Sequence, residues 1–120
     1  MQLPRTIAEA ATWLSNGTIS SVELTKVLLT RCHSTQDELA AFITICDQSA
    51  LTAAQKADRE LAQGINRGPL HGIPLAVKDN IATADAPTTA NSKALDPDWA
   101  EGIDATVVRN LRQAGAIIMG

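Results

Sequence analysis

The sequence predicts an α/β fold, and three observations lead to this prediction. A strand pattern at residues 73–78 is followed by a helix pattern at 105–114 and by a second strand pattern at 116–119. Two helix-start motifs stand near the N-terminus. Because a strand–helix–strand unit pairs its strands in parallel, we expect a sheet with helices packed over it.

The N-terminal part of the chain is typical of amphipathic helices. A capping box, T-x-x-E at residues 6–9, predicts a helix to about Leu14, and Gly17 lies just past its end. The same motif, S-x-x-E at residues 20–23, predicts a second helix with an apolar stripe to about His33. Two such helices need an apolar surface to cover.

The next segment, LAAFITIC at residues 39–46, is rich in apolar and β-branched residues and indicates a short strand or an extended segment. Asp47 is then expected to be the N-cap of a third helix, from Gln48 to Gln63, which Gly64 ends. One face of this helix is rich in alanine and allows close packing on a neighbour: Ala50, Leu51, Ala54, Ala57 and Leu61.

The second half begins with a turn-rich loop at 64–72, followed by the buried strand IPLAVK, which ends on Lys78. Residues 82–103 are irregular and contain two prolines. Asp104 is expected to cap the helix at 105–114. Because the apolar strand at 116–119 needs neighbours on both sides, we expect the sequence to be a truncated piece of a longer chain.

Composition excludes several classes of function. The 120 residues are 45% hydrophobic with a formal net charge of −3, so the basic surplus of a direct nucleic-acid binder is missing. The apolar runs are short and the N-terminus has no signal-peptide pattern, so no membrane contact and a cytoplasmic location are expected. Cys32 and Cys46 are interpreted as reduced structural thiols, with no metal and no cofactor.

Lys78 is the residue whose position most strongly suggests chemistry. Parallel strands of α/β proteins present functional groups at their carboxyl ends. A lysine there can pair with an acid such as Asp79, hold an anion, form a Schiff base or act as a base. A lysine in water titrates near pH 10.4, so keeping the amine neutral at pH 7 costs about 4.6 kcal/mol, which burial reduces. The pattern alone leaves the ion pair and the base both open.

Three blocks, in this order and spacing, resemble the N-terminal portion of the amidase signature family: GPLHGIPLAVKDNI at 68–81, APTTANS at 86–92 and DATVVRNLRQAGAIIMG at 104–120. The resemblance implies an α/β/α sandwich with a mixed central sheet. It also implies that residues 1–120 are the N-terminal segment of a single amidase-signature domain, with N-terminal helices at 1–64 and the first core strands and lysine block at 65–120.

The resemblance further implies an amidase that cleaves linear amide bonds with a Ser–cis-Ser–Lys triad, to which this chain supplies only the catalytic Lys78. The alternatives are the A subunit of an aspartyl/glutamyl-tRNA amidotransferase, acting as a glutaminase, or an inactive fragment. The implied partners are a small-molecule amide and the remainder of the domain, with a second copy or amidotransferase subunits as further candidates.

This sequence departs from the family pattern in two places. The Gly/Ser-rich segment that carries both serines is missing, so no serine here is the nucleophile and the isolated chain is expected to be inactive. Asn91 stands where many relatives have glycine, and asparagine tolerates the left-handed backbone expected there. Two roles are considered for Thr88, Thr89 and Ser92: they line a pocket, or they staple the loop through hydroxyl–backbone bonds. Asp79 and Asn80 are expected to fix the turn after the strand.

Overall fold

Four helices and two short strands follow one another along residues 2–120, which are the residues that this computed structural model describes. Their bounds are α1 (Ile7–Ser15), α2 (Ser21–Leu39), α3 (Asp47–Ala62), β1 (Pro74–Leu75), α4 (Thr106–Gln113) and β2 (Ile117–Ile118). The strands pair in parallel, with Pro74 opposite Ile117 and Leu75 opposite Ile118. The predicted α/β class and the β1–α4–β2 unit are therefore confirmed.

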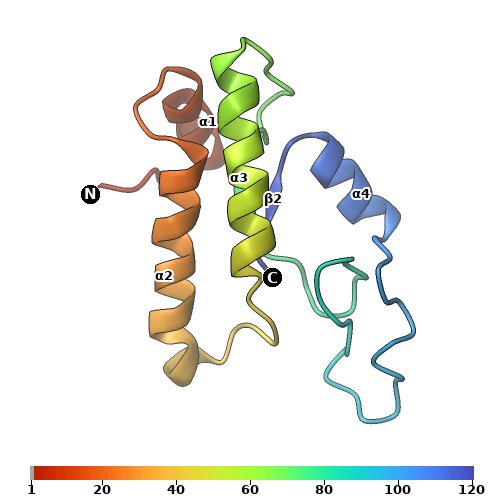
Figure 1. Ribbon diagram of the computed structural model, residues 1–120. Helices are drawn as coiled ribbons and strands as arrows, with labels where there is room; N and C mark the ends of the chain where they lie inside the picture. The colour runs from red at the N-terminus through yellow and green to blue at the C-terminus, as the bar shows by residue number, and fades with distance from the viewer. Residues whose placement is uncertain (1) are drawn as a thin grey trace.

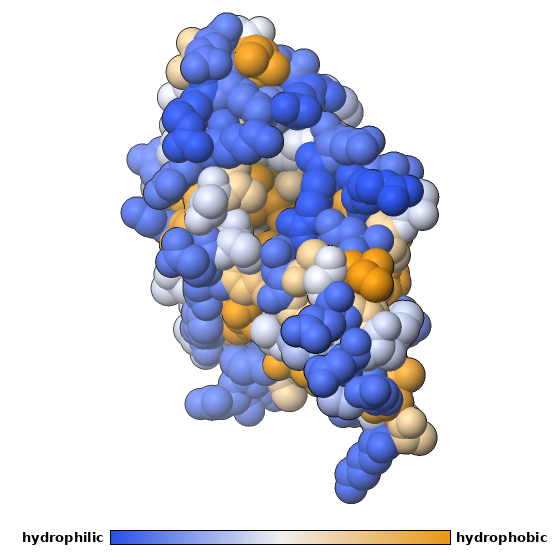
Figure 2. All heavy atoms as spheres, turned by 45° about the vertical axis from the view of Figure 1, so that its right-hand side comes forward, coloured by the Kyte–Doolittle hydropathy of each residue, from blue (hydrophilic) through white to orange (hydrophobic). Residues whose placement is uncertain are grey.

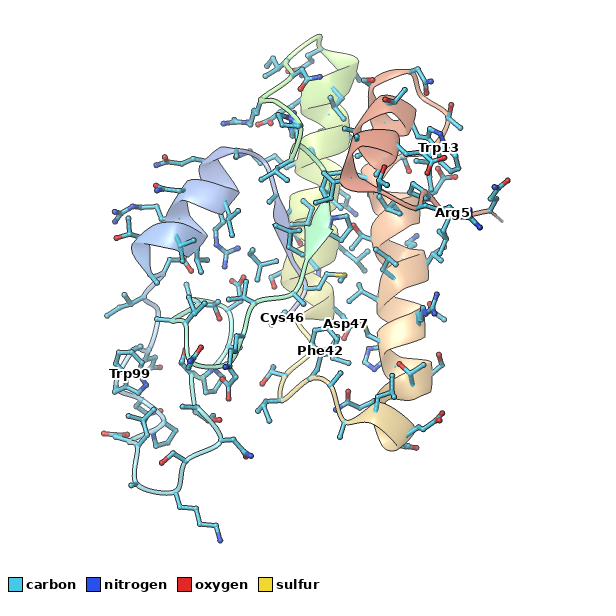
Figure 3. All side chains as sticks on the ribbon, turned by 180° about the vertical axis from the view of Figure 1, so that it is seen from behind. Arg5, Trp13, Phe42, Cys46, Asp47 and Trp99 are labelled. Atoms are coloured by element: carbon cyan, nitrogen blue, oxygen red, sulfur yellow. The ribbon has the colours of Figure 1, made fainter. Side chains whose placement is uncertain are left out.

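The helices and the sheet form two layers. Helices α2 and α3 run antiparallel side by side, with β2 behind α3 and α4 to one side (Figure 1). The view from behind shows both strands in front of these helices (Figure 3). The alanine-rich face of α3 packs here as predicted, since Ala50 and Ala54 are fully buried in one cluster with Ile117 and Met119. Small side chains let the helix approach the sheet closely.

Backbone pairing continues beyond the assigned strands. The Gly72 N–H donates to the Gly115 carbonyl at 2.8 Å, and the Val77 N–H donates to the Gly120 carbonyl at 2.8 Å. On the other side of β2, the Cys46 N–H donates to the Met119 carbonyl at 2.7 Å. Leu39 belongs to α2, and residues 40–46 are assigned neither helix nor strand, with a bend at Ile43. The predicted short strand is therefore wrong, although Cys46 does pair with the residue after β2.

The N-terminus of α2 is tied to the rest of the fold. The predicted capping box is complete, because the Ser20 hydroxyl accepts the Glu23 N–H and the Glu23 carboxylate accepts the Ser20 N–H. Asp58 of α3 accepts the N–H groups of Ser21 at 2.6 Å and Val22 at 3.0 Å. The buried Ser21 hydroxyl donates to the Gly72 carbonyl at 2.8 Å. This contact connects the helix layer to the entry of β1.

Helix α2 is longer than predicted, ending at Leu39 instead of His33. The apolar stripe stops near His33, but polar contacts support the added turns: the Thr35 hydroxyl donates to the Arg31 carbonyl, and the Gln36 amide both donates to and accepts from the Phe42 backbone. Apolar periodicity does not detect such contacts. None of the helices within residues 2–120 combines the length and apolar character needed to cross a membrane.

Both predicted aspartate caps are wrong, for the same reason. The N-cap of α3 is Cys46, and the Asp47 carboxylate instead lies 2.9 Å from His33 Nε2. The N-cap of α4 is Ala105, and the Asp104 carboxylate accepts the Ala84 N–H and pairs with an arginine of α4. In each case a partner distant in sequence takes the carboxylate away from the helix end.

Candidate active site

Lys78 follows the backbone pairing of β1 with β2 by a single residue, so it lies at the carboxyl end of the strand as predicted. The Ile81 N–H donates to its carbonyl at 3.0 Å, which turns the chain away from the sheet. The expectation that the strand end would bury Lys78 is wrong, because the side chain is exposed. Pro74 and Leu75 are covered by the helix layer, whereas that cover does not reach Lys78.

The residues around Lys78 enclose an open hollow of about 400 Å³. Its lining is mostly apolar and comes from three stretches of chain: Ala41, Phe42, Ile43, Thr44, Ala76, Val77, Lys78, Asp79, Ile81, Thr83, Ala86, Pro87 and Gly120. Figure 3 shows Phe42 near the carboxyl end of the strands. Sequence reasoning did not predict the contribution of residues 41–44, although their apolar run was the available clue. An amine at the edge of an apolar hollow suits chemistry on a small organic molecule.

The ion pair between Lys78 and Asp79, one of the alternatives from the sequence, does not form. Lys78 takes part in none of the ion pairs found among residues 2–120. The Asp79 carboxylate instead accepts both the backbone N–H of Thr89, at 3.0 Å, and the Thr89 hydroxyl. Burial acts to raise the pKa of Asp79, but hydrogen bonds from Thr89 and from the Asn91 backbone outweigh it and lower the pKa. Asp79 therefore anchors the following loop.

That loop has the turn geometry expected from the sequence. Ala90 and Asn91 have φ values of 47° and 49°, so the left-handed turn predicted at Asn91 is confirmed. The Thr89 hydroxyl accepts the Asn91 N–H and the Ser92 hydroxyl accepts the Ala94 N–H, which confirms stapling for these two residues. Thr88 is buried and its carbonyl accepts the indole N–H of Trp99. None of Thr88, Thr89 and Ser92 lines the hollow.

The histidine of the GPLHG stretch belongs to a second cluster. His71 Nδ1 accepts the Arg67 N–H at 3.1 Å, so this histidine is bonded to the backbone of its own loop. Its Nε2 lies 3.0 Å from Glu60 without the alignment of a good hydrogen bond, and the side chain is 1% exposed. Arg67 forms two bonds of 2.8 Å to the same carboxylate. These contacts fasten the loop at 64–72 to α3.

On the side of the molecule that carries α4, apolar residues lie in a furrow between hydrophilic ones (Figure 2). A small hollow of about 180 Å³ between α3 and the entry of β2 is lined by Glu60, Arg67, His71, Arg112 and Ile117, among others. Since the Glu60 carboxylate is already bonded to Arg67, and Arg112 pairs with Asp85 and Asp104, the charges there are internally paired. We therefore interpret the residues of this small hollow as part of the packing of the fold.

Replacing Glu60 with glutamine is expected to lower the free energy of unfolding by about 1 kcal/mol at pH 7, as for a partly exposed ion pair. Hydrogen bonding to Arg67 lowers the pKa of Glu60 from 4.5 to about 2. Because the folded-state pKa is the lower one, the contribution is complete above about pH 4.5 and is lost as the pH falls toward 2. Denaturant unfolding between pH 2 and pH 7 measures the difference.

The matched control is Glu38→Gln, at an exposed position of α2, which is expected to change stability by less than about 0.5 kcal/mol at every pH. A Glu60→Gln difference that did not shrink with acid would contradict the assigned role of the charge.

Within residues 2–120, no three His, Cys, Asp or Glu side chains are grouped so that they could hold a metal ion. Cys32 and Cys46 are free thiols, as predicted. Burial raises the pKa of both, and the charge of Asp85 adds to the effect at Cys46. Thiols with raised pKa values stay protonated near neutral pH and are poor nucleophiles. Neither thiol lines the hollow beside Lys78.

Known proteins match this chain over most of its length. The family model described as Amidase matches residues 23–120. The chain is 42% identical over 113 residues to the A subunit of the glutamyl-tRNA(Gln) amidotransferase from Salinispora tropica, and 41% identical over 115 residues to that from Natranaerobius thermophilus. These matches cover 94% and 96% of the chain but only 23% of each relative.

Among solved structures, the native peptide amidase from Stenotrophomonas maltophilia superposes with a TM-score of 0.88 at 39% identity. The match covers 97% of this chain and 24% of that enzyme. The chain thus spans about a quarter of the length of the proteins it matches.

Proposed function

The chain belongs to the amidase family, and from this premise we propose that the whole protein cleaves a linear amide bond with a Ser–cis-Ser–Lys triad in which Lys78 is the base. The observation that carries the proposal is the position of Lys78, at the carboxyl end of β1 and on the hollow of about 400 Å³. The ordered blocks at 68–81, 86–92 and 104–120 support it. Both serines belong to a Gly/Ser-rich segment that this sequence does not contain.

In the proposed reaction, the nucleophilic serine attacks the amide carbonyl and passes its proton through the second serine to the neutral Lys78 amine. The tetrahedral intermediate collapses, its C–N bond breaks, and the proton returns to the leaving amine. Water then attacks the acyl-enzyme by the same route and releases the carboxylic acid. The Lys78 side chain lies beside the mostly apolar lining of the hollow, which includes Phe42 and Ile81.

The domain organisation is part of the same proposal. Residues 1–64 supply the covering helices and 65–120 supply the first core strands of a single amidase domain. The partners are a small-molecule amide and the remainder of that domain, and the reaction takes place in the cytoplasm. The 120-residue chain by itself lacks both serines and is expected to show no amide hydrolysis.

A second candidate is supported by the relatives that are named as A subunits of glutamyl-tRNA(Gln) amidotransferases. On this alternative the protein releases ammonia from glutamine and works with other subunits. The identity to the peptide amidase, 39%, is close to the 42% and 41% of these relatives, so identity does not separate the two.

The deciding experiment uses the protein expressed from its complete reading frame and purified without partners. Simple primary amides, peptide amides and glutamine are supplied in turn, and released ammonia is measured. Turnover of a simple or peptide amide is expected from an amidase that acts alone. Ammonia release from glutamine only, and only after partner subunits are added, would support the amidotransferase. Absence of turnover under both conditions would reject the proposed function.

A further inference from the structure

Asp79 follows Lys78 in the sequence, but both oxygens of its carboxylate accept hydrogen bonds from Thr89. One oxygen accepts the Thr89 N–H at 3.0 Å and the other accepts the Thr89 hydroxyl. The Asp79 carbonyl accepts the Ala90 N–H at 2.7 Å, so the main chain holds the same loop. The left-handed turn at Ala90 and Asn91 brings these donors together. Such a cluster fixes the direction of the carboxylate.

This direction matters because few other charges face Lys78. Among the side chains that line the hollow, Lys78 and Asp79 are the ionisable ones. Asp85 lies close by in the chain, but its carboxylate is bonded to Arg112 at 2.7 Å. The contribution of Gly120 to the lining is main chain only. Among the residues that line the hollow, Asp79 is therefore the acid that could pair with Lys78.

A carboxylate that turned to Lys78 would stabilise the ammonium form and oppose its use as a base. We propose that Thr89 is a positioning residue that holds the Asp79 carboxylate away from Lys78 and so keeps the lysine amine available. The second half of this statement, the availability for catalysis, rests on the proposed function. The first half concerns only the charges of this chain and is testable without turnover.

The test measures the protonation of Lys78 directly. The protein expressed from its complete reading frame is labelled with a trace of acetic anhydride at a series of pH values, and mass spectrometry quantifies the acetylated peptide that contains Lys78. The labelling midpoint is compared between wild type, Thr89→Val and Thr89→Ser. Valine keeps the shape of threonine without its hydroxyl, whereas serine keeps the hydroxyl.

Thr89→Val is expected to raise the labelling midpoint of Lys78 by about half a pH unit, the size that a partly exposed ion pair gives. Thr89→Ser is expected to keep the wild-type midpoint. Asp79→Asn is expected to lower the midpoint, and to lower it more in the Thr89→Val background than in wild type. This coupling is the readout that a merely structural role of Thr89 does not produce.

Equal midpoints for wild type and Thr89→Val, or no coupling with Asp79→Asn, would overturn the inference. If Thr89→Val does not fold, as judged by circular dichroism, Thr89→Ala is compared in its place because it removes the hydroxyl without adding atoms. A failure of the proposed function looks different: either no amide is turned over, or the Lys78 variants keep their turnover, while the labelling midpoints still report on the Asp79 carboxylate.

Discussion

Replacing Lys78 with alanine is expected to reduce kcat/KM for amide hydrolysis about 10³-fold, in the range that loss of a general base gives. Lys78→Arg is expected to lose nearly as much, because a guanidinium keeps the charge but does not release its proton near neutral pH. Since the Lys78 side chain is exposed, neither change removes buried contacts, and both variants are expected to fold. Steady-state kinetics on the amide that the wild type turns over provide the measurement.

The matched control for Lys78 is Lys93→Ala, which removes an exposed lysine from the same irregular connection between β1 and α4. It is expected to leave kcat/KM within about twofold of wild type. Addition of a small primary amine is expected to restore part of the activity of Lys78→Ala, as a replacement for the missing base. Near-normal turnover of Lys78→Arg would show that the lysine acts through its charge alone.

The second large effect is expected at Gly115, where alanine should lower the free energy of unfolding by about 3 kcal/mol. Gly115 has φ 84°, and a Cβ there would lie 2.4 Å from His71 Cδ2 and 3.1 Å from its Cα. His71 has little room to retreat, because its side chain is 1% exposed and its Nδ1 accepts the Arg67 N–H. The strained backbone and the overlap therefore both lower the stability. Denaturant unfolding of the two proteins gives the difference.

Gly64→Ala isolates the steric part of this prediction. Gly64 has φ 79° and occupies the same position after α3 that Gly115 occupies after α4, but its Cβ would meet nothing within 4 Å. Alanine there is expected to cost only the backbone strain, about 1 kcal/mol. Equal losses at the two glycines would mean that His71 yields to the added methyl group.

Local motifs explain which parts of the fold could be predicted from the sequence. The Ser20 capping box formed as expected because its partner is three residues away. The caps expected from Asp47 and Asp104 did not form, because His33 and Arg112 compete for those carboxylates from distant positions. Propensity and spacing describe which residues are near in sequence. The group that a carboxylate finally binds depends on the tertiary fold.

The candidate site also has features that the sequence predicted and features that it did not. The strand pattern predicted that Lys78 ends β1, and the turn pattern predicted the left-handed backbone of Asn91. The bond between Asp79 and Thr89 was not predicted, because it joins residues ten positions apart across an irregular segment. The exposure of Lys78 was missed because alternation along a strand does not reveal where the covering layer stops.

The two bonds from Asp58 to the N-terminus of α2 also affect how this part of the molecule meets anions. The first N–H groups of a helix carry a partial positive charge and commonly bind phosphate or carboxylate ligands. Here the Asp58 carboxylate and the Ser20 hydroxyl already accept the N–H groups of Ser21, Val22 and Glu23. Helix α2 thus carries its own counter-ion, and an anionic ligand gains no free donor from these three groups.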